Sequence, residues 1–208
     1  SVNKCGDDLY WTLADSTLTI TGSGAMYEYA NKQMIPWYNQ RNNIAYVSLP
    51  DGLTNIARNA FYNCDALRTV NIPNGVTSIG RDAFYDCDAL TAITLPNTVT
   101  NIGNRVFYDC YNLSSAINIP EGVTAIGDST FYNCNRITSI TIPNTVTSIG
   151  IYAFYNCDGI SDIIIPNGVT TINDHTFYNC DGFTSIIIPN SVTSIGIYAF
   201  GYCYNLAS

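Results

Sequence analysis

The stretch that decides the fold is ITSITIPNTVTSIGIYAFYNCDG, residues 137–159, because close copies of these 23 residues precede and follow it. Repeats of this length are one supersecondary unit stacked many times, in which each coil buries its apolar side only against its neighbours. Aligned on the phenylalanine before each cysteine, the copies advance by 23 residues, with a single step of 24. The aligned residues are Phe61, Phe84, Phe107, Phe131, Phe154, Phe177 and Phe200. The sequence therefore predicts a mainly β repeat solenoid of seven coils.

Each coil is expected to have three short sides. Ile140 and Ile142 alternate with a polar residue, which predicts a β-strand ending at Pro143. A Pro-Asn turn leads to a second extended side, and Gly150 is expected to close it in a left-handed conformation. The third side, residues 150–157, spaces its apolar residues like one helical turn. Stacking such coils would give an arc with parallel strands.

The single step of 24 places one extra residue between Leu113 and Ile119, near Ser114 or Ser115. One added residue can bulge a strand and leave its neighbours in register. We therefore expect the next coil to keep its place in the stack.

Residues 1–43 do not fit the repeat and are predicted to be an N-terminal cap, with the solenoid at residues 44–208. Residues 9–14 and 17–21 alternate in polarity on either side of a turn, as in a β-hairpin. A hairpin there would cover the first coil, whose edge would otherwise be open.

The cap sequence also allows another interpretation, in which Trp37, Tyr27 and Tyr29 form an aromatic ligand cleft. At the other end, residues 204–208 start an eighth coil. Either Leu206 folds over the last coil, or further coils or modules follow, and we favour the second. An uncovered C-terminal edge could pair edge to edge with a second copy of the chain.

Charge excludes several partners. The formal net charge is −8, and the eight Lys and Arg residues are scattered, so no basic stripe exists for phosphate. Nucleic acid and anionic membranes are not expected partners. No apolar run approaches the roughly 18 to 20 residues that span a bilayer, so this segment is not expected to insert into a membrane.

Seven of the eight cysteines recur at one inward position of the repeat, where they act as small buried hydrophobes. Their side chains point the same way, which is the wrong geometry for disulfides between neighbours. Free, buried thiols are therefore expected, and Cys5 alone could be exposed. With one histidine and no CxxC pair, no zinc site or other cofactor is predicted.

The repeat LxxIxIPxxVTxIGxxAFYxC, together with the CGxxLxWTLxxxTLTITGxGAM…PW segment, resembles the BspA-type leucine-rich repeat proteins, also called the Treponema pallidum type. The resemblance covers almost the whole chain. It implies a parallel-stranded arc, a secreted or cell-surface location, and adhesion to host cells, matrix proteins or other microbes. It implies no catalytic residues.

Two candidate partner-binding surfaces follow from the repeat. The central residue of each LxxIxIP strand should face solvent, and it is polar except at Ile164 and Ile187. Two exposed isoleucines would form an apolar patch of a kind that can mark an interaction site. Alternatively, they strengthen strand pairing or meet a further segment of the protein.

The second candidate surface is the tyrosine after each phenylalanine. These residues are Tyr62, Tyr85, Tyr108, Tyr132, Tyr155 and Tyr178, with Tyr152 and Tyr198 in two coils and Asn63, Asn133, Asn156 and Asn179 beside them. Tyrosine and asparagine together suit recognition of proteins and sugars, because tyrosine offers contact area at small entropic cost. Alternatively, the tyrosines stack on one another and shield the inward phenylalanines.

Catalysis is not predicted. His175 lies five residues before Cys180, but that cysteine occupies the same repeat position as six others without a nearby histidine. Aspartates next to the cysteines are expected to bond turn backbone or face solvent, and they are too sparse to predict calcium. These are Asp86, Asp109, Asp158 and Asp181.

The sequence thus predicts a non-enzymatic, cell-surface or secreted protein that mediates adhesion. Its partner would be an extracellular protein or glycan of the host matrix or of a cell surface. The alternative is a passive spacer that presents another module of a longer surface protein.

Overall fold

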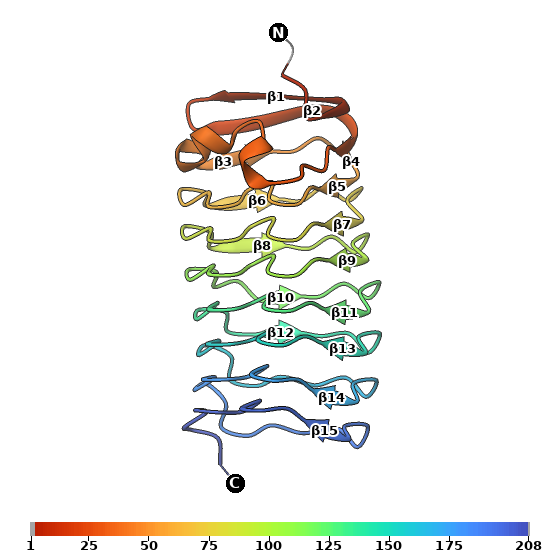
Figure 1. Cartoon of the computed structure of the whole chain (residues 1–208), viewed down its shortest axis with the longest axis vertical. Coiled ribbons are helices and arrows are strands. Elements are labelled where there is room, and N and C mark those ends of the chain that lie inside the picture. The colour runs from red at the N-terminus through yellow and green to blue at the C-terminus, as the bar shows by residue number, and fades with distance from the viewer. Residues whose placement is uncertain (1–2, 208) are drawn as a thin grey trace.

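The computed structural model describes residues 3–207 as one continuous column of stacked coils, with a hairpin across its N-terminal end (Figure 1). The hairpin consists of β1 (Gly6–Ala14) and β2 (Thr17–Met26), which pair antiparallel. Below it, strands of successive coils pair in parallel within several short sheets. The predicted β-solenoid with parallel strands and a hairpin cap is confirmed.

Short strands mark the first and second sides of the coils. On the first side lie β3 (Tyr46–Ser48), β6 (Thr69–Asn71), β8 (Ala92–Thr94), β10 (Ile117–Asn118) and β12 (Ile140–Thr141). On the second side lie β5 (Asn55–Ile56), β7 (Ser78–Ile79), β9 (Asn101–Ile102), β11 (Ala125–Ile126), β13 (Ser148–Ile149), β14 (Thr171–Ile172) and β15 (Ser194–Ile195). The remaining elements are β4 (Gly52–Leu53), which pairs with β2, and the 3₁₀ helices η1 (Lys32–Met34) and η2 (Tyr38–Asn43).

The hairpin closes through Asp15 and Ser16, whose φ angles of 47° and 63° match the two-residue turn that suits twisted strands. Its second strand, β2, continues into the stack by pairing in parallel with β3. Leu18, a residue of β2, is fully buried. The hairpin therefore covers the edge of the first coil, whereas the division into a cap at residues 1–43 and a solenoid at residues 44–208 stays a prediction.

Trp37 closes the apolar core at the cap. Its side chain is 2% exposed, its Nε1 donates to the carbonyl of Ala60 at 2.7 Å, and its ring lies 6.3 Å from that of Phe61. Trp11 meets it edge to face. An aromatic ligand cleft that uses Trp37 is therefore wrong, because the ring is covered by the chain itself.

The core is a ladder of the seven aligned phenylalanines. Phe131, for example, stacks on Phe107 and on Phe154 with 5.5 Å between ring centroids on both sides. Six of the seven rings are fully buried, and Phe200 in the last coil is partly buried. Every inner ring thus belongs to two interfaces between coils.

The third side is not a helical turn, as the sequence predicted, but a run of tight turns. Tyr152 and Asn156 both have φ of 56°, in the left-handed region, which interrupts any right-handed helix. Backbone amides instead donate to the next coil, as Phe131 does to the carbonyl of Ala153 at 2.9 Å. The apolar residues Ala153, Phe154 and Cys157 are fully buried, but hydrogen bonds between coils determine the backbone conformation.

Gly150 also corrects a prediction. Among the glycines of residues 3–207, only Gly22 and Gly24 have φ in the left-handed region. A Cβ on Gly150 would lie 2.6 Å from the backbone nitrogen of Asp128 in the preceding coil. Glycine is required there because two backbones approach closely. Ala57 takes this position in the first coil, where its amide meets the flexible Met26 side chain.

The extra residue forms a local bulge, as predicted. The amides of Ser114 and Ser115 both donate to the carbonyl of Thr91, at 3.0 and 3.3 Å. One sheet ends at β8 and another begins at β10. The phenylalanine ladder continues across this step with its usual spacing, so the next coil keeps its place.

All eight cysteines lie within the described residues, and all are buried and free. Each repeat thiol from Cys87 onward donates to the carbonyl of the phenylalanine one coil before, as Cys134 does to Phe107 at 3.1 Å. Burial raises the pKa of these thiols, and it raises that of Cys5 to about 11. The predicted free, buried thiols are confirmed, and Cys5 proves to be buried as well.

We expect the native chain to resist thiol reagents at neutral pH, because the thiolate is the reactive form and burial suppresses it. An Ellman titration should detect no rapidly reacting thiol in the native protein and eight after denaturation. A rapid native phase equal to one or more thiols would contradict the buried positions described here.

Candidate functional site

The tyrosines that follow the core phenylalanines form a second ladder on the outside of the third side. Neighbouring ring centroids lie 4.4 to 4.8 Å apart and the rings are nearly parallel. The six members are the predicted Tyr62, Tyr85, Tyr108, Tyr132, Tyr155 and Tyr178, hereafter the tyrosine ladder. Each is partly buried. The alternative of mutual stacking is thus what the structure has, and the ladder presents ring edges and hydroxyl groups to solvent.

A row of amide and carboxylate side chains accompanies the tyrosine ladder. Asn156 Nδ2 donates to Asn133 Oδ1 at 2.8 Å, and Asn179 Nδ2 donates to Asn156 Oδ1 at 2.9 Å. Asn133 in turn donates to Asp109. The position before each cysteine has left-handed φ, which Asn and Asp tolerate better than other residues except glycine. These side chains therefore serve first to connect the coils.

In six coils the residue three positions before the ladder tyrosine has positive φ, and in the seventh coil Tyr198 has the equivalent position before Gly201. These residues, hereafter the outer column, are Asn59, Asp82, Arg105, Ser129, Tyr152, His175 and Tyr198. Tyr152 and Tyr198 were expected at this surface from the sequence, whereas Arg105 and Ser129 were not. Their shared repeat position was the available signal.

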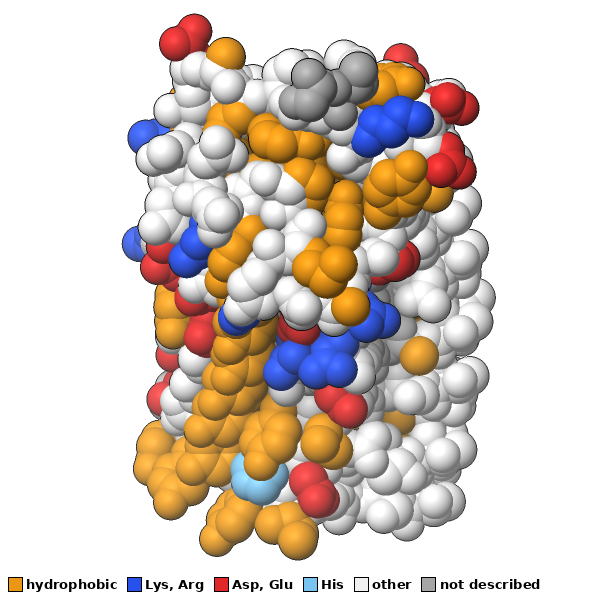
Figure 2. Space-filling view, turned by 45° about the horizontal axis from the view of Figure 1, so that its top comes forward, with side chains coloured by type: hydrophobic (Ala, Val, Ile, Leu, Met, Phe, Trp, Pro, Cys, Tyr) orange, Lys and Arg blue, Asp and Glu red, His pale blue; other side chains and the backbone are white. Residues whose placement is uncertain are grey.

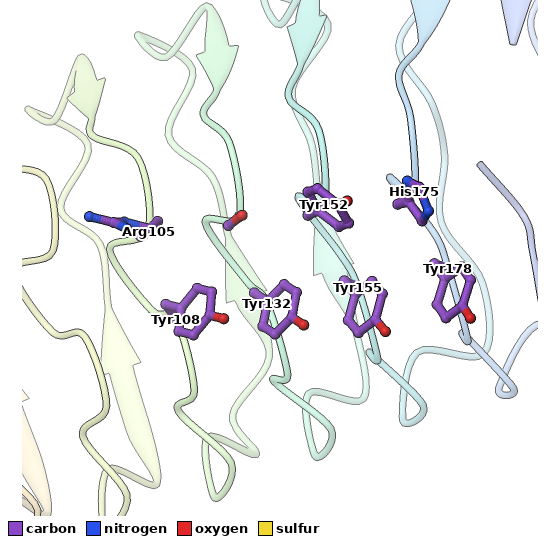
Figure 3. A pocket seen from close by; sticks show the side chains of 8 residues that line it. Arg105, Tyr108, Tyr132, Tyr152, Tyr155, His175 and Tyr178 are labelled. Atoms are coloured by element: carbon purple, nitrogen blue, oxygen red, sulfur yellow. The ribbon is translucent and has the colours of Figure 1, made fainter. Parts of the chain in front are cut away.

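The outer column and the tyrosine ladder run side by side and enclose a hollow (Figure 3). Its volume is about 500 Å³, and its lining residues are Arg105, Tyr108, Ser129, Tyr132, Tyr152, Tyr155, His175 and Tyr178. Figure 2 shows the tyrosines as an orange stripe beside the pale blue histidine, with Lys and Arg side chains near its N-terminal end. At this end of the ladder, Lys32 places Nζ 3.8 Å from the ring centre of Tyr62.

Burial keeps the hydroxyl groups of Tyr85, Tyr108 and Tyr132 protonated. It raises the pKa of Tyr85 to about 12, and it also raises the pKa of Tyr108 and Tyr132. Each phenol therefore offers a donor as well as an acceptor at neutral pH. The surface can make many hydrogen bonds with a polar ligand without itself carrying charge.

The second predicted surface lies on the first side of the coils. Ile164 and Ile187 are 83% and 84% exposed and form an isolated parallel bridge. They border a hollow of about 430 Å³ with Asp162 and Pro189. Their outward direction is confirmed. Whether they bind a partner stays a prediction.

The geometry offers no catalytic pair at His175 and Cys180. The thiol of Cys180 is buried and donates to the carbonyl of Phe154 at 3.0 Å, and burial raises its pKa well above the usual range. The imidazole of His175 stacks instead on Tyr152, with ring centroids 4.8 Å apart. Neither residue is therefore arranged as part of a nucleophile and base pair.

Three of the four aspartates beside the cysteines bond to neighbouring coils, Asp181 by accepting from the amide of Tyr204, whereas Oδ1 of Asp158 is buried without a partner in the described part of the chain. Asp86 accepts from Asn63 and Asp109 accepts from Asn133, each at 2.7 Å. Among residues 3–207, no cluster of three or more His, Cys, Asp or Glu side chains is placed to hold a metal ion. Across the same residues, no helix has the length and apolar character needed to cross a membrane.

Comparison with known proteins gives one family and several related folds. The family model of the BspA type leucine rich repeat region matches residues 36–157 and 101–208, with six copies. No curated protein matches.

Among solved structures, a T. pallidum leucine-rich repeat protein is 27% identical, with a TM-score of 0.75 over 99% of this chain and 91% of that one. A leucine-rich repeat protein from Eubacterium ventriosum is 28% identical, with a TM-score of 0.64 over 99% of this chain and 70% of that one. The pneumococcal vaccine antigen PcpA is 18% identical, with a TM-score of 0.51 over 77% of this chain and 49% of that one, and it shares the fold alone.

Proposed function

The chain belongs to the BspA type leucine-rich repeat family, and from this we propose that it is a non-enzymatic adhesion protein, secreted or at the cell surface. It binds an extracellular protein or glycan of host or neighbouring cells through the tyrosine ladder and the outer column. The observation that carries the proposal is the continuity of this surface over six coils. Repeated surfaces of solenoids suit extended partners, because each coil offers the same contact again.

The chemistry of this surface supports recognition. Tyrosine contributes a rigid apolar ring and a hydroxyl group that bonds water or a partner. Stacking fixes the rings before any ligand arrives, which lowers the entropic cost of binding. The hollow beside Tyr132 and Tyr155 adds a concave site to an otherwise flat stripe.

A passive spacer remains the second candidate function. The coil-to-coil hydrogen bonds and the continuous phenylalanine ladder favour it, since they make a stiff column that could hold another module away from a surface. The two functions differ in whether the coils themselves bind anything.

The test is binding of the chain to an array of matrix proteins and glycans at physiological salt. The Tyr155→Ser, Tyr178→Ser double variant should lose most of the binding, because it removes two rungs that line the hollow. The matched control is the double variant Ile164→Thr, Ile187→Thr. It introduces threonine, the residue that the equivalent position of an earlier coil has as Thr141. It should bind as the unchanged chain does.

Both double variants must first give the circular dichroism spectrum of the unchanged chain. Absence of binding by the unchanged chain would refute the adhesion proposal for these coils and favour the spacer. Loss of binding in the isoleucine variant alone would move the binding surface to the first side of the coils.

A further inference from the structure

The outer column has a notch at Ser129. On the N-terminal side, the Arg105 guanidinium is bound to Asp82, with Nε 2.8 Å from Oδ1 and Nη2 2.8 Å from Oδ2. Asp82 lies one coil before Arg105, so the guanidinium reaches away from Ser129. On the C-terminal side stands the ring of Tyr152 (Figure 3). The short serine between two large residues leaves space that lies within the 500 Å³ hollow.

Tyr152 presents one ring face to this notch. Its C-terminal face is covered by His175, with centroids 4.8 Å apart and ring planes 22° from parallel. Tyr132 and Tyr155 meet it at 63° and 61°, as edges. The opposite face is directed toward Ser129 in the coil before. It differs from the faces of the tyrosine ladder, which are stacked on one another.

We propose that this notch binds one neutral pyranose residue of an extracellular glycan, stacked on the open face of Tyr152. The inference rests on the proposed function and names the ligand class of the same surface. An aromatic face carries partial negative charge and attracts the partially positive C–H groups on one side of a sugar ring. A pyranose also needs hydrogen-bond partners around its rim, and the lining residues supply them.

Two kinds of polar group surround the notch. Ser129 contributes a hydroxyl group at its base, and the ladder contributes phenol groups that stay protonated at neutral pH. A few placed polar groups beside an apolar wall are typical of small-ligand sites.

Charge favours a neutral sugar over an acidic one. Arg105 is the one Lys or Arg among the described residues that line the hollow, and Asp82 already neutralises it. Asp128 and Asp174 adjoin the outer column, and their carboxylates accept from the amides of Ile151 and Ile197. An anionic ligand would therefore meet carboxylates without an available cation.

The test is saturation-transfer NMR of the whole chain with methyl β-glucopyranoside, methyl β-galactopyranoside and methyl α-mannopyranoside at millimolar concentration. Methyl β-glucuronide serves as the acidic comparison. Saturation should reach the ring C–H protons of at least one neutral probe. The glucuronide should give a weaker signal than the glucoside.

Two substitutions should each lower the affinity of the chain for that neutral probe by about tenfold or more. Tyr152→Ala removes the ring face, and Ser129→Tyr fills the notch. The second keeps the fold, because tyrosine already occupies equivalent positions at φ of 56° and 50°, close to the 53° of Ser129. The matched control is Tyr46→Ala, which removes an exposed tyrosine of β3, on the first side of the coils, and should leave the signal unchanged.

Transfer to none of the neutral probes, or transfer that survives both Tyr152→Ala and Ser129→Tyr, would overturn the pyranose site. A matrix protein whose binding is unaffected by Ser129→Tyr, together with no sugar signal, would refute this inference and leave the proposed adhesion function intact.

Discussion

Replacing Phe131 with alanine is expected to lower the free energy of unfolding by about 3–5 kcal/mol. The ring is fully buried and stacks on Phe107 and Phe154, each at 5.5 Å. Truncation therefore opens a cavity at two interfaces between coils, and each coil has few contacts besides those with its neighbours. Urea unfolding followed by far-ultraviolet circular dichroism measures the loss as a lower midpoint.

The matched control is Phe200→Ala in the last coil. Phe200 is partly buried, and in the described chain it stacks on Phe177 alone. We expect a loss about half as large or smaller, since one interface is affected instead of two. Equal losses at both positions would show that stability is not carried by interfaces between coils.

The second large effect is expected from Gly150→Ala, which should cost about 1–3 kcal/mol. The added Cβ would contact Asp128 Oδ1 and would lie 2.6 Å from the Asp128 nitrogen and 2.7 Å from the Gly127 carbonyl carbon. The coils cannot separate to make room, because the Gly150 amide donates to the carbonyl of Ile126 at 2.9 Å.

Gly168→Ala is the control for this prediction. A Cβ there would meet the Thr147 methyl group at 3.0 Å, and that exposed side chain can move. Its effect should stay within about 0.5 kcal/mol. A comparison of the two thermal melts decides the matter, and equal melting temperatures for the two variants would contradict a close approach of backbones at Gly150.

The strands could be read from the sequence because their cause is local. Alternation around Thr141 and the proline that follows predicted the strand that the structure has as β12. The inward cysteines and phenylalanines could be read for the same reason, since every coil repeats them. Because the same type of residue recurs at the same position in successive copies of the repeat, the sequence identifies the buried apolar positions unambiguously.

The third side could not be read in this way. Residues 150–157 show an apolar spacing that a helical turn and a row of tight turns share. Long-range hydrogen bonds to the next coil decide between them, and no local pattern encodes those bonds. The predicted left-handed φ at Gly150 was wrong for a similar reason, because glycine is suited both to a left-handed φ and to a close approach of two backbones.

The candidate site was predicted in part. The tyrosine ladder follows from its repeat position, but only the structure shows that its ring faces are occupied by each other. The notch arises at Ser129, where one coil departs from the bulky residues of its neighbours. The residue type changes from coil to coil in the outer column, so the repeat pattern does not identify these positions as a common surface.

We propose the tyrosine side of the column as the recognition surface of this chain. Hydroxyl-radical footprinting of the unchanged chain, with and without a ligand found on the array, tests it most directly. We predict reduced oxidation at Tyr132, Tyr152 and Tyr155, with Ile164 and Ile187 unchanged. Protection at the isoleucines with unchanged tyrosines would contradict the claim.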